Sequence, residues 1–372
     1  MDAIDRPVVL DARMIGHSGI GVYIRGLLEG WRDGTPDFWP TLLGDPAILQ
    51  KHLSEATRYT IVPFRAPIYG LREQMTFPTR ATHGALLHCP HYNIALRHSG
   101  SLVVTIHDLI HLDARFGLRS PLRRFYARWM LRTAVGRARH IFADSQATAD
   151  DLTARLNVAR EKITVVYSAP SRVFLNGRPQ PYAIEQFRRE MGLPADYLLT
   201  VGLYKPHKNI DLLFEAFKSL RESQKTRLSL VLAGTQEKER SVLRNRLAQM
   251  GISQDVRILD WLLAERLPLL YAGAAALIHP SLIEGFGLPT VEAQSVGTPV
   301  AASRASAIPE VAGEGALFFD PLDADDLARQ IVAVIENQDL RERLVAAGYQ
   351  NVKRFSWRES AQKVLSVYKK VT

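Results

Sequence analysis

Two glutamates, Glu284 and Glu292, are separated by seven residues in the segment PSLIEGFGLPTVEA, which spans residues 280–293. A short apolar run, Ala276–Ile278, precedes this segment and predicts a buried strand. Pro289 is typical of the first turn of a helix, so a helix is expected to begin there. The pattern therefore predicts a strand, a glycine-containing loop that carries Glu284, and a helix that carries Glu292.

This strand–loop–helix segment has the features of a phosphate site. Gly285 and Gly287 allow a ligand to approach the backbone closely, and a helix start offers amide protons and a positive dipole end. The Glu292 carboxylate, one turn into the helix, could accept two hydroxyl protons from a ribose. Spacing alone fits a surface loop with a helix-capping glutamate equally well.

A second segment, VGLYKPHKN at residues 201–209, follows another predicted strand and leads into another predicted helix. Lys205 and Lys208 are three residues apart at that helix entry, so together they could neutralise a diphosphate leaving group. Gly202 would provide the turn after the strand. Taken alone, the segment is more typical of a solvated turn with surface lysines.

Two segments of the amino-terminal half also place polar groups after predicted strands. Gly19 and Gly21 belong to a glycine-containing loop whose spacing, Gly-x-x-Gly-x-Gly, differs from that of a dinucleotide fingerprint. His107 and Asp108 follow the predicted strand 102–106. A lone histidine at a strand end is more often structural, and we interpret Asp108 as a residue that orients its loop.

Short β-branched runs alternate with amphipathic stretches along the whole chain, which predicts parallel sheets covered on both faces. The strands expected from these runs are 8–10, 102–106, 140–143, 163–166, 197–201, 228–233, 256–259, 276–278 and 299–302. Helices are expected at 210–220, 238–250, 262–272 and 359–368, the last with Ser356 as its N-cap.

The alternation pauses once, between residues 170 and 194, where NGRPQP (176–181) is the best linker candidate. We therefore predict an amino-terminal domain at 1–180 and a second domain at 181–355. Residues 356–372 are expected to form a helix that packs back on the first domain. Two open sheets joined in this way would place their ligand sites at a common cleft.

Composition limits the class of protein. A length of 372 residues suits two domains, and 47% hydrophobic with 23% charged residues excludes disordered and fibrous classes. No apolar run approaches the roughly 18 residues needed to span a bilayer, and the start of the chain lacks signal-peptide features. With its single cysteine, Cys89, the chain is expected to be cytoplasmic.

Together, the segments around Lys208 and Glu284 resemble the donor-binding lobe of glycosyltransferase family 4. This is a retaining family of group 1 glycosyltransferases with the GT-B fold of two Rossmann-like domains. The segments 303–313 (SRASAIPEVAG) and 318–321 (FFDP) match its downstream pattern. The segment Lys-Pro-His-Lys-Asn at 205–209 is similar to sequences of the mannosyltransferase branch of this family. The resemblance is strong over 197–321 and looser before that.

The resemblance implies a role for each matching residue. In the family pattern, Glu292 holds the ribose, Lys208 contacts the donor diphosphate, and Glu284 meets the donor sugar. The family's active-site histidine matches His107, and its glycine-bearing loop near the donor phosphates matches Gly19 and Gly21. The remaining donor-binding positions that the resemblance implies are Gly202, Lys205, Gly285, Phe286, Gly287 and Leu288.

Two positions depart from the family pattern, and a third matches it in a structural role. Leu203 stands where many members have an arginine, so Lys205 would have to supply that charge. Asp260-Trp261 stands where the family often has glycine near the nucleobase, which puts recognition of the base in doubt. Ser145, in the family's Asp-Ser at a strand end, is interpreted as a helix cap.

Metal sites are not expected. The histidines and the cysteine between residues 83 and 111 match no known ligand spacing, so no metal or other cofactor is predicted. Asp323-Ala-Asp325 is formally a metal-diphosphate motif of another glycosyltransferase fold, but its position indicates a helix amino terminus.

The net charge of +9 is concentrated in the segment from Arg115 to Arg139, which holds eight arginines and no acid. Aromatic and aliphatic residues lie between the arginines, as suits an anionic membrane surface or a lipid-diphosphate acceptor. A helix with its apolar face in the core and its arginines in water fits equally well. Nucleic-acid binding is not expected, because no nucleic-acid-binding module is recognisable.

The combined prediction is a metal-independent retaining hexosyltransferase that uses a nucleotide sugar, with GDP-mannose favoured over UDP- or dTDP-sugars. Its acceptor would be a glycan or a lipid-linked glycan in polysaccharide or lipopolysaccharide assembly, with the enzyme peripheral at the inner face of the membrane. A sugar-phosphate synthase with a soluble acceptor is the alternative within the family. An NAD-dependent oxidoreductase and a non-catalytic sugar-binding protein are the alternatives from other classes.

Overall fold

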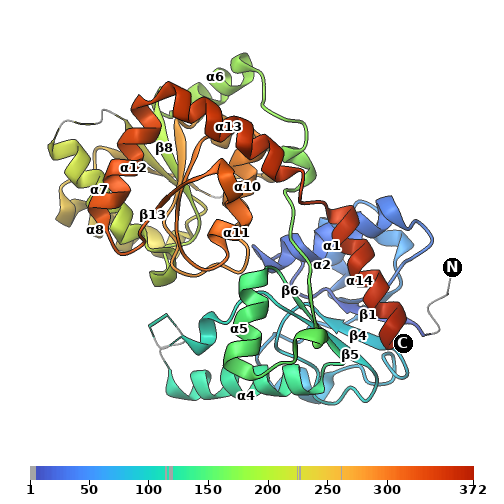
Figure 1. Ribbon diagram of the computed structural model, residues 1–372. Coiled ribbons are helices and arrows are strands. Elements are labelled where there is room, and N and C mark those ends of the chain that lie inside the picture. The colour runs from blue at the N-terminus through green and yellow to red at the C-terminus, as the bar shows by residue number, and fades with distance from the viewer. Residues whose placement is uncertain (1–5, 114, 117–119, 224, 226–227, 261) are drawn as a thin grey trace. The chain divides into compact units, whose positions relative to one another are not determined.

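The computed structural model describes residues 6–113, 115–116, 120–223, 225, 228–260 and 262–372. Contacts divide the chain into two units: Met1–Ala169 with Phe355–Thr372, and Pro170–Arg354. Figure 1 shows both units as sheets flanked by helices.

The first unit contains a parallel sheet that has seven strands within the described residues, in the order β3-β2-β1-β4-β5-β6-β7. Its strands are β1 (Val8–Asp11), β2 (Thr41–Gly44), β3 (Ile61–Pro63), β4 (Leu86–Cys89), β5 (Leu102–Ile106), β6 (His140–Ala143) and β7 (Ile163–Val165). Its helices are α1 (Ile20–Gly34), α2 (Pro46–His52), α3 (Leu71–Thr76), α4 (Pro121–Arg137), α5 (Gln146–Leu156) and α14 (Trp357–Val371), with 3-10 turns η1 (Ala56–Arg58), η2 (Ile110–Leu112) and η3 (Arg160–Lys162).

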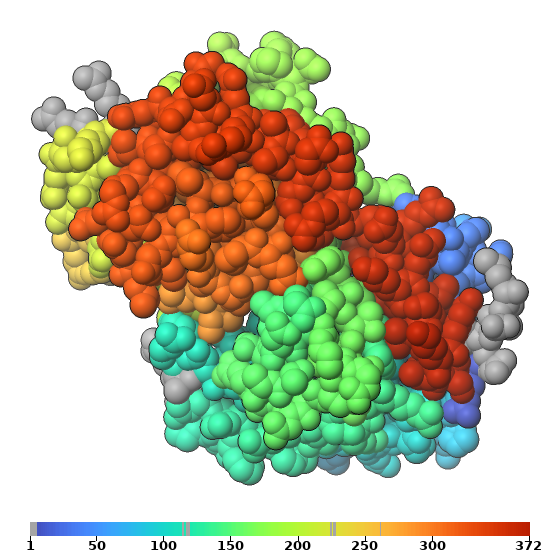
Figure 2. Space-filling view, in the orientation of Figure 1, coloured from blue at the N-terminus to red at the C-terminus, as the bar shows by residue number. Residues whose placement is uncertain are grey.

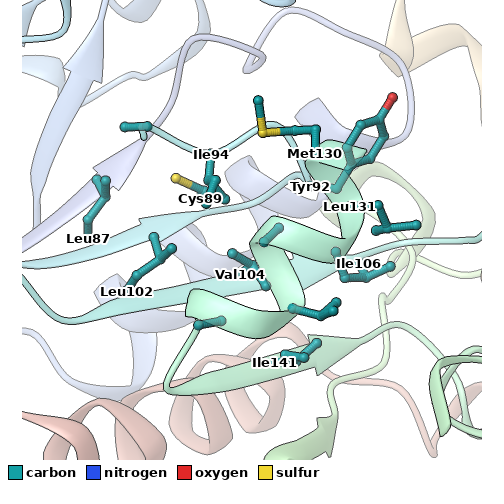
Figure 3. Packing of buried hydrophobic residues seen from close by; sticks show 14 of the residues in the cluster. Leu87, Cys89, Tyr92, Ile94, Leu102, Val104, Ile106, Met130, Leu131 and Ile141 are labelled. Carbon is teal, nitrogen blue, oxygen red and sulfur yellow. The ribbon is translucent and has the colours of Figure 1, made fainter. Parts of the chain in front are cut away.

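Alternate residues along these strands face opposite cores. Cys89, Val104 and Ile106 belong to the hydrophobic cluster that α4 completes through Met130 and Leu131, as Figure 3 shows. On the opposite face of the sheet, His88, Thr105 and Phe142 lie towards α1 and α14. Both faces are therefore covered, as the apolar character of the strands predicts.

Helix α14 returns to the first unit and packs along α1 (Figure 1). A Cβ atom added at Gly26 would lie 2.1 Å from the Trp357 ring, so the two helices approach as closely as glycine permits. Ser356 caps α14 by accepting the Glu359 N–H, which confirms the predicted N-cap.

The second unit contains a parallel sheet with six strands among the described residues, in the order β10-β9-β8-β11-β12-β13. Its strands are β8 (Tyr197–Val201), β9 (Ser229–Ala233), β10 (Val256–Ile258), β11 (Ala276–His279), β12 (Val300–Ser303) and β13 (Leu317–Phe319). Its helices are α6 (Pro181–Glu190), α7 (Ile210–Glu222), α8 (Glu237–Met250), α9 (Leu267–Ala272), α10 (Leu288–Ser295), α11 (Ile308–Ala312), α12 (Ala324–Glu336) and α13 (Gln338–Val352), with 3-10 turns η4 (Arg172–Phe174), η5 (Pro206–Lys208), η6 (Ala264–Arg266) and η7 (Gly313–Gly315).

Two hydrophobic clusters sandwich this second sheet. Helices α7, α8, α12 and α13 cover one face, and α6, α9, α10 and α11 cover the other. Strand residues alternate between the clusters, so that Leu198 faces the first and Leu199 the second. Figure 2 shows α12 and α13 in orange-red on the outside of this unit.

The structure refines several predicted boundaries. The segment 262–272 begins as an extended stretch and the turn η6, and its α-helix starts only at Leu267. Contacts divide the two units at Ala169–Pro170, whereas the sequence suggested about residue 180. The intervening stretch packs on the second unit, because Phe174 is buried there and Arg178 donates to the carbonyls of Ala272 and Val296.

Candidate active site

In the second unit, the loops after β8 and β11 lie at the point where the strand order reverses. These strands are neighbours in the sheet, and the chain continues outward from them in opposite directions. Ligands in open parallel sheets bind at such switch points, at the carboxyl ends of the strands. The Leu282 N–H donates to the His207 carbonyl over 2.7 Å, which holds the two loops together.

Glycines shape both loops. Gly202 follows β8 with a φ of 148°, and Gly287 precedes α10 with a φ of 93°. Both values are in the region that side chains disfavour, so each turn requires glycine. Pro289 lies in the first turn of α10, as predicted. Gly285, Phe286 and Leu288 occupy the loop and the helix start.

Glu284 lies on the loop between β11 and α10, where it contacts two basic side chains. Its Oε1 accepts a hydrogen bond from Lys208 Nζ at 2.6 Å and lies 3.2 Å from His279 Nε2. Burial acts to raise the pKa of Glu284, but Lys208 and His279 outweigh burial and hold that pKa well below its usual range. The Ser306 hydroxyl donates to the Glu284 carbonyl at 2.8 Å, so the loop is also fixed through its backbone. The result is a buried, ionised carboxylate whose charge Lys208 balances.

Lys208 and Lys205 differ in their surroundings. The Lys208 side chain is 21% exposed and directed to Glu284, whereas that of Lys205 is 42% exposed and its Nζ lies 3.6 Å from Glu239 Oε1. Lys208 is therefore held by a close ion pair, while Lys205 has a longer contact with the buried Glu239.

Glu292 lies in α10, as predicted, and one of its carboxylate oxygens is engaged. The Tyr271 hydroxyl donates to Oε2 at 2.7 Å. Among the described residues no donor reaches Oε1, which leaves that oxygen available to a ligand hydroxyl. Burial raises the pKa of Glu292 to about 7, although the hydrogen bond from Tyr271 acts in the opposite direction.

In the first unit, His107 follows β5 and Asp144 follows the neighbouring strand β6. His107 Nδ1 lies 2.6 Å from Asp144 Oδ2, and Nε2 lies 3.0 Å from the Pro90 carbonyl oxygen. The Pro90 carbonyl can only accept a hydrogen bond, so Nε2 carries a proton. Burial acts to lower the pKa of His107, but the charge and hydrogen bond of Asp144 raise it overall.

The glycine-containing loop of the first unit has a structural basis. Gly19 is the N-cap residue of α1 with a φ of 71°, and a Cβ at Gly21 would lie 2.4 Å from the Ile15 carbonyl oxygen. The loop is thus packed against the start of α1. Asp108 Oδ1 accepts the Ile110 N–H at 2.9 Å, which confirms its predicted role in orienting the loop after β5.

The switch point of the first sheet, between β1 and β4, also carries polar groups. Arg13 is paired there with Asp11 and, at 2.6 Å, with Glu73. A small pocket lined in part by Arg13 lies at this edge of the sheet. Its lining residues are Asp11, Arg13, Met14, Ile68, Cys89, Pro90, His91 and Asn93.

The remaining candidates are structural where they are described. Ser145 accepts the Thr148 N–H at the start of α5, and Asp323 accepts the Asp326 N–H at the start of α12, so both predicted helix starts are confirmed. Asp260 is paired with Arg240, and Trp261 lies outside the described residues. No group of three or more histidine, cysteine or acidic side chains suited to a metal ion occurs within the described ranges.

Sequence reasoning missed Asp144 and His279 as site residues. Both lie at the carboxyl ends of strands that neighbour the strand of a candidate, which is a signal that pairing of the strands would have revealed. Asp144 was assigned only to a capping motif, and His279 ends β11 just before the glutamate loop.

Two models of known protein families match this chain. A model of "Glycosyl transferases group 1" matches residues 184–351, and one of "Glycosyltransferase Family 4" matches residues 42–169. Together they cover well over half of the chain. The chain belongs to the family 4, group 1 glycosyltransferases. The resemblance and the fold class inferred from the sequence are thereby confirmed, and the oxidoreductase and non-catalytic alternatives are set aside.

Several relatives of this glycosyltransferase are mannosyltransferases. O-antigen chain mannosyltransferase B of Escherichia coli is 28% identical over 84% of this chain and 79% of its own length. MMP alpha-(1->4)-mannosyltransferase of Mycolicibacterium hassiacum is 30% identical over 72% of this chain and 65% of its own length. The match to the serotype-specific mannosyltransferase WbdA of Escherichia coli spans only 32% of that protein.

Solved structures share the glycosyltransferase fold over nearly the whole chain. Anabaena Alr3699/HepE, in complex with UDP and glucose, has a TM-score of 0.76 at 18% identity and covers 97% of this chain and 99% of its own. Sucrose-phosphate synthase from Thermosynechococcus elongatus has a TM-score of 0.77 at 18% identity, with 98% of each chain covered. Within the described residues, no helix is both long and apolar enough to cross a membrane.

Proposed function

We propose that this enzyme transfers a mannosyl unit from GDP-mannose to a hydroxyl group of a glycan, with retention at the anomeric carbon. The observation that carries the proposal is the switch point of the second sheet. A buried ionised Glu284 paired with Lys208 lies there just before α10, and Glu292 presents a free oxygen from the first turns of that helix. These groups suit, in turn, a donor sugar, a diphosphate and a ribose.

The mannosyl unit is supported by the relatives, several of which are named as mannosyltransferases. Mannose is ordinarily activated as its GDP derivative, so GDP is favoured over UDP. The solved neighbours that hold UDP are 18% identical and bear on the fold alone.

In the proposed reaction, the bond from the anomeric carbon to the diphosphate oxygen breaks and a bond to the acceptor oxygen forms on the same face. The departing diphosphate oxygen takes the acceptor's proton. Lys208, Lys205 and the amides at the start of α10 would stabilise the charge on the diphosphate. With this charge supplied by the protein, we propose that no metal or other cofactor is required.

The first unit would supply the acceptor side. The polar side chains at its β1–β4 switch point, Arg13, Asp11 and Asn93, are the candidates for contact with the acceptor sugar. For His107 to contact the donor sugar, its Nε2 has to exchange the Pro90 carbonyl for a sugar oxygen, while Asp144 holds the ring in place through Nδ1.

We propose further that the acceptor is lipid-linked and that the reaction belongs to polysaccharide or lipopolysaccharide assembly at the cytoplasmic face of a membrane. The relatives named as O-antigen chain mannosyltransferases support this setting.

Thermal unfolding tests the donor site. Wild-type protein and Glu292→Ala would be heated with GDP, UDP, dTDP, ADP or NAD, with magnesium or with a chelator. A nucleotide at 100 times its dissociation constant stabilises the folded state by about 2.7 kcal/mol. We expect GDP to raise the melting temperature of the wild type with the chelator present, and the variant to lose that response. Stabilisation by NAD alone would refute the donor site.

Transfer assays then test the reaction. Labelled GDP-mannose would be offered with a lipid-linked glycan, a soluble glycan and a soluble sugar phosphate. Product on the sugar phosphate alone would show a synthase-type enzyme instead. An inverted anomeric configuration in the product would refute retention.

A further inference from the structure

Helix α4 is apolar on two opposite faces. Met130, Leu131 and Ala134 are buried in the core of the first unit, as Figure 3 shows for the first two. Leu122 and Phe125, by contrast, are 77% and 69% exposed.

The exposed apolar residues of α4 form one stripe. Leu122, Phe125 and Trp129 are spaced by three and four residues, so at about 3.6 residues per turn they lie on one side of the helix. Trp129 is 44% exposed. The same geometry places Ala127 and Leu131 on the opposite, buried side. Three large apolar side chains of α4 therefore lie on the surface of the first unit, outside its buried core.

Arginines flank this stripe. Arg124, Arg128 and Arg132 recur every four residues and form a row beside it, and Arg123 lies near the helix start. Within the described part of the chain, no carboxylate pairs with any of these four side chains. Their charges are available to an external anion.

Helix α3 of the same unit also exposes large apolar side chains. Leu71 and Met75 are 85% and 71% exposed, whereas Glu73 is buried. Both helices are fixed to one segment, because Asn93 donates to Glu73 and accepts a hydrogen bond from Tyr126 of α4.

Among its described residues, the second unit has no such concentration of exposed apolar side chains. Its exposed large apolar residues come one each from separate helices and loops, and they are Leu175, Tyr182, Val242, Leu263, Leu322 and Tyr349. Scattered single residues of this kind are ordinary for a protein surface, whereas a stripe rimmed by charge marks an interaction site.

We infer that α4 is a docking surface for an anionic lipid bilayer, with Leu122, Phe125 and Trp129 inserted among the lipids and the arginines on the headgroups. Interfacial helices have this composition, with tryptophan, phenylalanine and leucine on one side and arginine on the other. The inference rests on the proposed lipid-linked acceptor and adds the surface by which the enzyme reaches it.

The charge and the exposed apolar side chains of α4 together favour a lipid bilayer over other partners. A nucleic acid would use the arginines but leave the apolar stripe in water. A second copy of the chain would cover the stripe but would bring two rows of unpaired arginines together. An anionic bilayer satisfies both kinds of side chain.

Sedimentation with vesicles tests the inference on the full chain. Vesicles of equal parts phosphatidylcholine and phosphatidylglycerol would be compared with vesicles of phosphatidylcholine. We expect binding to the mixed vesicles that weakens with added salt. Replacing Arg124, Arg128 and Arg132 with glutamine should weaken it roughly fivefold per arginine, equivalent to ~1 kcal/mol each.

The stripe itself is tested with a matched control. Leu122→Ser, Phe125→Ser and Trp129→Ser together should lower vesicle binding by at least about tenfold. The same change at three exposed apolar residues of the second unit, Leu175, Tyr182 and Leu263, should leave it unchanged. Retained stabilisation by GDP would show that each variant is folded.

Three results would overturn the inference. They are failure of the wild type to bind mixed vesicles, equal binding by the stripe variant, and a dimer in solution that the stripe variant converts to a monomer. Stabilisation by GDP and transfer to a lipid-linked glycan dispersed in detergent are measured in the same preparations. If the wild type shows neither stabilisation nor transfer, the proposed function is refuted. If it shows both but does not bind vesicles, only the docking surface is refuted.

Discussion

Binding of the nucleotide sugar should strengthen as pH rises through neutrality, because Glu292 must be ionised to accept hydroxyl protons. Its pKa is raised to about 7 by burial. At about pH 6 only about a tenth of the molecules carry the ionised carboxylate, whereas at about pH 8 nearly all do. The apparent dissociation constant for GDP-mannose should therefore fall about tenfold between these values.

Isothermal titration calorimetry with GDP-mannose measures this change directly. The intact sugar nucleotide is the right ligand, because its diphosphate is a diester and does not titrate near neutrality, unlike the terminal phosphate of GDP. Titrations in buffers of different ionisation enthalpy should also show release of a proton on binding near pH 6. Glu292→Gln should bind weakly with no dependence on pH in this range. A wild-type affinity that is flat between these pH values would refute the reasoning.

The same pKa has a consequence for stability. A carboxyl group whose folded-state pKa is raised above 4.5 binds more protons in the folded than in the unfolded protein. The stability it confers is present below about pH 4.5 and lost as pH rises towards 7. Glu292→Gln removes this loss, so it should be more stable than the wild type at about pH 8, by about 1–3 kcal/mol in urea unfolding. Equal free energies of unfolding at that pH would contradict the raised pKa.

Two further predictions concern charged pairs of the site. Lys208→Met should lower kcat by about 10²–10³-fold and the free energy of unfolding by about 3–5 kcal/mol, because it leaves Glu284 buried without its cation. Lys205→Met, at a half-exposed side chain, should change stability by less than about 1 kcal/mol, and an equal loss in both variants would argue against the assignment. His107→Phe should cost about 3–5 kcal/mol in thermal or urea unfolding, because Asp144 loses its buried partner. The matched change Asp144→Asn, which removes the buried charge itself, should cost less, and the opposite order would show that this pair does not hold the two strand ends.

The sequence was informative where local chemistry determines structure. The helix start predicted from Pro289 and the cap predicted at Ser356 are confirmed, and Gly202 and Gly287 have the positive φ values that favour glycine. The apolar runs also identified β1 and β5 in the first sheet and β8 and β11 in the second.

The remaining elements depend on tertiary contacts. Strands β2, β3, β4 and β13 have three or four residues and were not predicted, because the pairing that makes so short a run a strand comes from its neighbours in the sheet. The pairing of His107 with Asp144 likewise links residues 37 apart in sequence through the order of strands. The hydrophobic periodicity of a sequence does not reveal the order of the strands in the sheet.

The return of α14 to the first unit has a consequence for synthesis on the ribosome. The first unit is interrupted at Ala169 and completed only when Phe355–Thr372 has emerged. At roughly 5–20 residues per second, that wait lasts on the order of 10–40 s. Throughout it, the face of α1 that Trp357 later covers stays exposed, and the contiguous second unit can fold before the first is whole. A nascent chain of this kind is a natural client for a chaperone that shields apolar helix faces, and a stop codon before α14 would leave that face uncovered permanently.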